Sequence, residues 1–144
     1  MDAVAVQEML LEDRREWHSL VALLEANPYE PLHDPESPGW ISRDVYTHLA
    51  CWMEHSTGEL EARLADRTVP ALGGTDDQIN AGFRDAHGHM SHDEARAWAQ
   101  REFDRRIQAI ESVPPERWDP MLEAVARADG AQHYRAHHSY IAVS

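Results

Sequence analysis

Residues 44–52, DVYTHLACW, place a histidine where an amphipathic helix normally carries apolar side chains. Val45, Leu49 and Trp52 recur at the three- and four-residue spacing that puts side chains on one face of a helix. His48 follows Val45 by three residues and precedes Trp52 by four, so it shares this face. An inward histidine is either a core residue satisfied by a neighbour or a ligand for something bound inside the protein, and this stretch leaves both interpretations open.

Helical periodicity continues on both sides of this stretch, and alternating strand patterns are nearly absent. The predicted helices cover residues 4–26, 42–64, 76–86, 91–113 and 130–142, and residues 116–128 are predicted to be irregular or partly helical. Ser42 is the predicted N-cap of the second helix, and Asp129 is the predicted cap of the last. Ser91 and Glu94 have the spacing of a capping box.

Four amphipathic helices and one short extra helix predict an all-α fold, a four-helix bundle formed by a single domain over residues 1–144. The connection between the helices at 42–64 and 91–113 is unusually long for neighbouring antiparallel helices, at about 25 residues. It therefore predicts a crossover that spans the length of the bundle.

Charge and composition narrow the classes of partner. The formal net charge is -13, with 13 basic against 26 acidic residues, which argues against binding to nucleic acid or to an anionic membrane surface. The apolar runs are too short for a membrane span and the first residues do not resemble a signal peptide, so a cytoplasmic location is expected. The remaining partners are a small molecule, a metal ion or a second copy of the chain.

A pair of histidines near the C-terminus has the spacing of metal ligands. His133 and His137 are separated by one helical turn, about 6 Å along the axis, so both imidazoles can reach one ion. The spacing resembles that of the HExxH metalloproteases, but the glutamate base of that motif is missing here. A third ligand from another helix is needed to make the pair convincing.

His48 is the best third ligand, because metal sites in bundles are built from inward side chains on facing helices. His55, two turns further along, is the rival ligand from the same helix. A second histidine group, His87, His89 and His92, could form a loop site, although a polar turn is the simpler interpretation. Three neutral imidazoles leave one open position on a tetrahedral ion, as in catalytic zinc sites.

Three segments together resemble a known family. They are GWISRDVYTHLACW at 39–52, AQHYRAHHSYI at 131–141, and INAGFRDAHGHMSHDEARAWAQREFDRRIQAIESVPPERW at 79–118. The first two resemble the DVxxHLxxW and HYxxH elements of the DinB-like superfamily of metal-binding four-helix bundles. The third is similar to the branch that includes colibactin self-resistance proteins.

The resemblance implies an all-α bundle, often homodimeric, with a divalent metal such as zinc or nickel. The histidine triad of the family falls on His48, His133 and His137. Relatives include transferases that use low-molecular-weight thiols (mycothiol, bacillithiol or glutathione), a thiol-dependent maleylpyruvate isomerase and detoxifying hydrolases. Some members have no demonstrated activity.

Three hypotheses for function follow. The main one is a metal-dependent transferase or hydrolase of small electrophilic molecules, acting in detoxification, with a low-molecular-weight thiol as a cosubstrate. The second is a bundle that binds a small molecule or metal without catalysis, and the third is a structural bundle with three satisfied core histidines. Cys51, the only cysteine, is interpreted either as a reactive thiol or, more simply, as a small buried hydrophobe.

Overall fold

The computed structural model describes residues 1–141 and consists of helices joined by loops over that range. The all-α prediction is confirmed. The elements are α1 (Ala3–Ala26), α2 (Ser42–Leu64), α3 (Asp76–His87), α4 (His92–Glu111), the 3-10 turn η1 (Pro115–Arg117), α5 (Pro120–Arg127) and α6 (Ala131–Ile141). None of the helices in this range combines the length and apolar character needed to cross a bilayer.

The number of helices exceeds the prediction, because α5 forms within the segment that was expected to be irregular or partly helical. Residues at the beginning of α5 explain why the helix starts there. Asp119 is the N-cap and accepts a hydrogen bond from the Leu122 backbone N–H at 2.7 Å, and Pro120 occupies the first helical position. Both are standard start signals, so α5 depends on residues next to it in sequence. Ala142, the predicted end of the last helix, lies outside the described residues.

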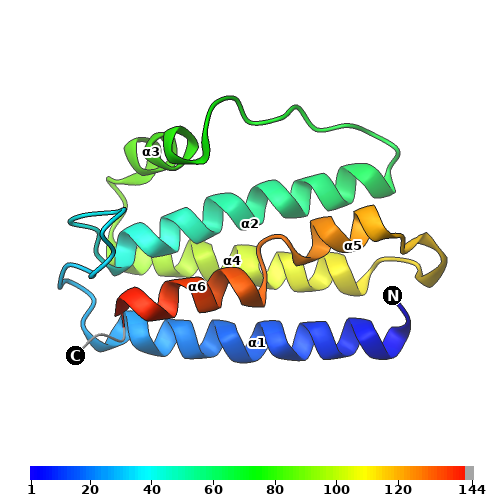
Figure 1. The fold of residues 1–144 in the computed structure, drawn as a ribbon, viewed down its shortest axis with the longest axis horizontal. Coiled ribbons are helices and arrows are strands. Elements are labelled where there is room, and N and C mark those ends of the chain that lie inside the picture. The colour runs from blue at the N-terminus through cyan, green and yellow to red at the C-terminus, as the bar shows by residue number, and fades with distance from the viewer. Residues whose placement is uncertain (142–144) are drawn as a thin grey trace.

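The helices form a bundle in which α5 and α6, end to end, occupy the place of a fourth long helix (Figure 1). α4 packs along α2, α6 packs on α1, and α5 packs on α2. The connection that contains α3 returns along the length of α2, so α2 and α4 run in the same direction (Figure 1). This is the crossover arrangement that the length of the connection favours.

Aromatic side chains fill the middle of the core. The rings of Trp17 and Phe103 stack with centroids 4.9 Å apart, and Tyr134 meets the Trp17 ring edge-on at 5.3 Å. The indole N–H of Trp17 donates to Gln100 Oε1 at 2.9 Å, so its one polar atom is satisfied. Contacts among α1, α4 and α6 therefore fix the last helix against the bundle.

The first turns of α2 are buried on every side. All residues from 44 to 51 are buried, including the polar side chains of Asp44 and Thr47. The predicted N-cap at Ser42 is wrong, because Ile41 is the cap and the Ser42 hydroxyl donates to the Leu24 carbonyl of α1 at 2.7 Å. Asp44 Oδ2 accepts from the Ile41 N–H at 2.9 Å instead. α2 is therefore anchored to α1 at the end that carries His48.

The start of α6 is held by a residue from α1. Asp13 Oδ1 accepts a hydrogen bond from the Ala131 N–H at 2.8 Å, so the cap predicted at Asp129 is supplied by a distant side chain instead. Asp13 Oδ2 also accepts from Arg106 at 2.7 Å, and Arg106 donates to the Ala126 carbonyl. This buried network ties α1, α4, α5 and α6 together at one point.

Candidate metal site

Three histidines from two helices meet near one end of the bundle. His48 lies in the second turn of α2, and His133 and His137 lie one turn apart on α6. The possible ligand atoms of the three side chains all lie within 4.8 Å of one another. His48 Nε2 and His133 Nε2 are 3.2 Å apart, and the His137 ring is edge-on to His48 at 5.2 Å between centroids. The structure thus brings together the three residues that the sequence singled out.

This arrangement fits a tetrahedral divalent ion. With Zn–N distances of 2.0–2.1 Å, two ligand nitrogens of one ion are about 3.4 Å apart. The His48–His133 separation is already close to this value, and the remaining pair distances need to shorten by about 1.4 Å at most. The three-histidine group can therefore hold a metal ion.

Burial favours the metal-binding neutral form of two of the three imidazoles, those of His48 and His137. Burial is the main cause that lowers the pKa of His48 well below its usual range, and the nearby His137 and His133 rings add to the effect. The pKa of His137 is lowered to about 3, mainly by burial and also by His133 and His138. Neutral imidazole has a free lone pair for a metal, whereas imidazolium does not. The site is thus preorganised electrostatically for a cation.

A cavity of about 610 Å³ opens in front of the three histidines. Trp40, Asn80 and Tyr140 form part of its walls, and the Trp40 ring packs edge-on against His48 at 5.5 Å. The charged lining residues are four carboxylates and one guanidinium: Asp34, Glu36, Asp77, Asp85 and Arg84. The volume is that of a small-molecule site. Besides Tyr140 of α6, these walls come from the loop before α2 and from α3, segments whose contribution could not be inferred from helical periodicity.

His55 and Cys51 belong to a different surface. Together with Phe83 and His87 they line a separate groove on the other side of α3, and His55 is outside the three-histidine group. Cys51 is 8% exposed, and burial, followed by the charges of Glu54 and Glu102, raises its pKa to about 12. Its thiol is therefore protonated near neutral pH, which favours the interpretation of a small buried hydrophobe.

The other histidine group predicted as a possible loop site has separate structural roles. His92 Nε2 contacts Glu25 Oε2 at 2.7 Å, and the His87 ring packs on Trp98 with centroids 4.7 Å apart. Within residues 1–141 the only cluster with metal-ligand geometry is formed by His48, His133 and His137. His87 ends α3 and the buried His92 begins α4, so only His89 of the three lies in the turn between these helices.

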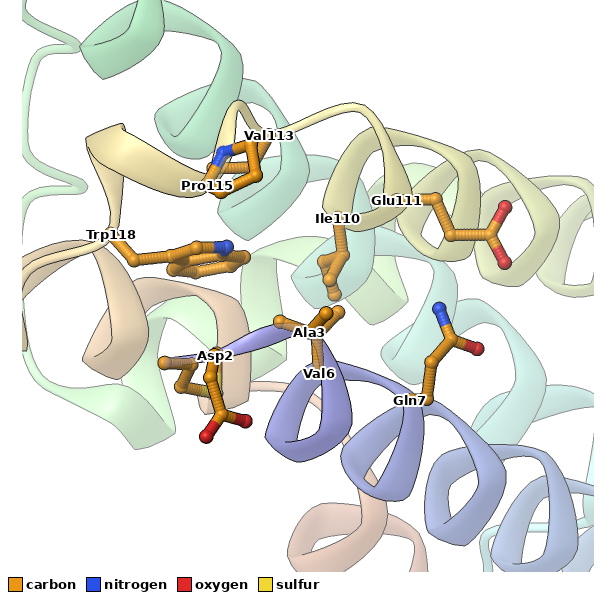
Figure 2. A pocket seen from close by; sticks show the side chains of 10 residues that line it. Asp2, Ala3, Val6, Gln7, Ile110, Glu111, Val113, Pro115 and Trp118 are labelled. Carbon is orange, nitrogen blue, oxygen red and sulfur yellow. The ribbon is translucent and has the colours of Figure 1, made fainter.

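A second cavity, at the opposite end of the bundle, is mostly apolar (Figure 2). It measures about 130 Å³ and lies between the start of α1 and the end of α4, where Val6, Ile110 and the Trp118 ring line it. Gln7 and Glu111 approach each other at its edge (Figure 2). Because its lining has no histidine or cysteine, we regard it as a packing gap.

Comparison of the chain with models of protein families, with curated proteins and with solved structures finds no significant match.

Proposed function

We propose that this chain is a metal-dependent transferase or hydrolase of small electrophilic molecules, a DinB-like bundle that binds one zinc or nickel ion on His48, His133 and His137. The observation that carries the proposal is a cluster of three imidazoles, two of them buried, in the lining of a cavity of about 610 Å³. When bound, a divalent ion supplies Lewis acidity, which lowers the pKa of a water molecule or a thiol at its open position.

The protein's own groups would hold and orient the reactants. His48, His133 and His137, carried on helices, would hold the ion where it borders the cavity. Trp40 and Tyr140 offer flat apolar surfaces on which a small electrophile can rest. A low-molecular-weight thiol as cosubstrate, and a homodimer as the working form, are proposed from the resemblance of the motifs.

A second candidate is a bundle that binds metal without turnover. The feature that favours it is the charge of the cavity lining, which contains four carboxylates and one arginine. An acidic entrance attracts divalent cations, whereas it disfavours anionic substrates. The two candidates share the metal site and differ only in catalysis.

The test starts with metal analysis of protein purified without a histidine tag. We expect close to one divalent ion per chain, or uptake of one ion on reconstitution with zinc or nickel at pH 7.5. Metal content that stays near zero after reconstitution would contradict both candidates.

Turnover then separates the two candidates. The loaded protein is mixed with a chloronitrobenzene and with each of glutathione, bacillithiol and mycothiol, and loss of the electrophile is compared with the His48→Ala variant. Consumption that needs both metal and thiol supports the transferase, and consumption with metal alone supports the hydrolase. Stoichiometric metal without any turnover favours the binding protein.

A further inference from the structure

A buried carboxylate lies behind one of the three histidines. Asp129 Oδ1 is 3.2 Å from His133 Nδ1, on the side of the ring away from His48. Asp129 is 7% exposed, and the His133 Nδ1 atom is completely enclosed. This contact is not a hydrogen bond, so the enclosed Nδ1 atom has no hydrogen-bond partner among the described residues. Within residues 1–141, neither His48 nor His137 has a carboxylate at ion-pair distance.

The backbone at Asp129 is held firmly. A Cβ atom added to the next residue, Gly130, would lie 2.5 Å from the Arg106 guanidinium and 2.7 Å from Asp13 Oδ1, so the chain passes directly over this buried ion pair. Arg106 also interacts electrostatically with Asp129, which offsets the cost of burying the carboxylate. Both the position and the charge of Asp129 are therefore maintained by groups that do not belong to the metal site.

Capping the helix does not explain this residue. The free N–H at the start of α6 is satisfied by Asp13 at 2.8 Å, which leaves the Asp129 carboxylate available for the His133 ring. Histidine ligands in metal sites commonly donate their second ring N–H to a carboxylate, which fixes the tautomer and the ring orientation. Asp129 lies in the turn just before α6, and its carboxylate reaches the His133 ring four residues further along the chain.

We infer that Asp129 is a positioning residue for His133: its carboxylate accepts the Nδ1–H and turns Nε2 toward the ion. The inference depends on the proposed metal site. With Nδ1–H held by Asp129, the lone pair of His133 Nε2 would be free to bind a metal ion. Losing such a partner typically weakens metal affinity by about 10- to 100-fold.

The test is a competitive zinc titration of wild type and Asp129→Asn at pH 7.5. We expect the variant to bind zinc about 10- to 100-fold more weakly, while one ion per chain is still bound. The matched control is Glu16→Gln, because Glu16 Oε2 lies 3.9 Å from Nδ1 of His138, a histidine on the same helix outside the triad. This control should bind zinc within about twofold of wild type, because it removes a charge that lies near a histidine outside the triad and contributes little.

A second measurement needs no variant and is insensitive to a general loss of stability. Long-range proton–nitrogen NMR of the wild-type imidazoles reports the tautomer, and His133 should carry its proton on Nδ1 once zinc is bound.

A third measurement compares the same two variants. The visible spectrum of the cobalt-substituted protein should shift in Asp129→Asn and stay unchanged in Glu16→Gln.

Two outcomes overturn the inference separately from the proposed function. Equal zinc affinity of Asp129→Asn and wild type, or a zinc-bound His133 protonated on Nε2, would overturn the role of Asp129 and leave the metal site standing. A wild-type protein that binds no zinc would overturn the metal site and this role with it. Zinc binding without turnover would contradict the enzymatic proposal and leave the role of Asp129 intact.

Discussion

At the scale of single residues, two neighbouring histidines have opposite surroundings. Successive helical residues point about 100° apart, so His137 and His138 cannot face the same ion without distorting α6. His137 is 9% exposed and faces His48 and His133, whereas His138 Nδ1 turns toward Glu16 of α1 at 3.9 Å. This pair provides an internal control for the assignment of the ligands.

Replacing single histidines by alanine should therefore have unequal effects on zinc affinity. His137→Ala and His48→Ala each remove one of three imidazole ligands, and we expect affinity to fall by orders of magnitude in both. His138→Ala and His55→Ala should stay within a fewfold of wild type, because neither side chain belongs to the cluster. Calorimetric zinc titration of the four variants is the measurement.

Circular dichroism of the same four proteins checks that each remains folded. Equal losses for His137→Ala and His138→Ala, or no loss for His48→Ala, would show that the ligands are wrongly assigned.

The triad could be predicted because each member follows from local spacing. The four-residue step of His133 and His137 sets them on one face, and His48 lies on the apolar stripe of its own helix. The cavity walls and the role of Asp129 could not be predicted. They depend on how the loop before α2, α3 and the Asp13–Arg106 pair pack at long range, and periodicity contains no information on such contacts.

At the scale of helices, α6 depends on side chains from elsewhere in the chain for its first turn. Asp13 is 2% exposed and binds both Arg106 and the Ala131 N–H, so one carboxylate satisfies a buried cation and a helix terminus. Asp129 stands just before this helix in the sequence, and the preference for aspartate at N-caps predicts it as the cap. The start of α5 was a recognisable local signal, but the start of α6 is set by tertiary structure.

We expect Asp13→Ala to destabilise the protein strongly. It leaves the buried Arg106 without its partner, a change that costs about 3–5 kcal/mol in comparable buried pairs. The control is Glu111→Ala, which breaks an Arg14–Glu111 bridge whose side chains are 42% and 44% exposed. Such surface pairs contribute about 0–1 kcal/mol.

Urea denaturation of both variants, followed by helical circular dichroism, measures the two losses. A free energy of unfolding for Asp13→Ala within about 1 kcal/mol of the Glu111→Ala value would contradict the anchoring role of Asp13.

At the scale of the whole molecule, the buried histidines make the stability of the metal-free protein depend on pH. The pKa values of His48 and His137 are lowered in the folded state, so the unfolded chain binds more protons than the folded one below about pH 6.5. Unfolding is therefore favoured as the pH falls from about 6.5 toward the lowered pKa values. The pKa of Glu25 is also lowered, from 4.5, so protonation of Glu25 lowers the free energy of unfolding only at still lower pH.

Between pH 7 and pH 5, the free energy of unfolding of the metal-free protein should fall by about 2 kcal/mol because of His137, and His48 should lower it further in the same direction. The His137→Gln variant should lose about 2 kcal/mol less than wild type over the same interval. Urea titrations with a chelator present, at several pH values, measure the slopes. Identical slopes for the two proteins would contradict burial of His137 in its neutral form.

Assembly is the other property of the whole molecule that can be tested. Val4 and Leu11 are 66% and 57% exposed and lie seven residues apart on α1, so they share its outer face. If a homodimer forms through this face, light scattering should give about twice the chain mass of 16.4 kDa. Leu11→Arg should then shift the mass to that of one chain, while Val69→Arg, in the α2–α3 connection, should leave it unchanged.

A monomeric mass for wild type at micromolar concentration would contradict the dimer.

The exposed crossover connection between α2 and α4 can be cleaved by a protease. Residues 65–78 are exposed throughout, and they separate His48 from His133 and His137 along the chain. A protease nick in this connection would leave two fragments, each with part of the ligand set, whose helices α2 and α4 still pack together. In such a split protein, a bound metal ion would link the two fragments reversibly.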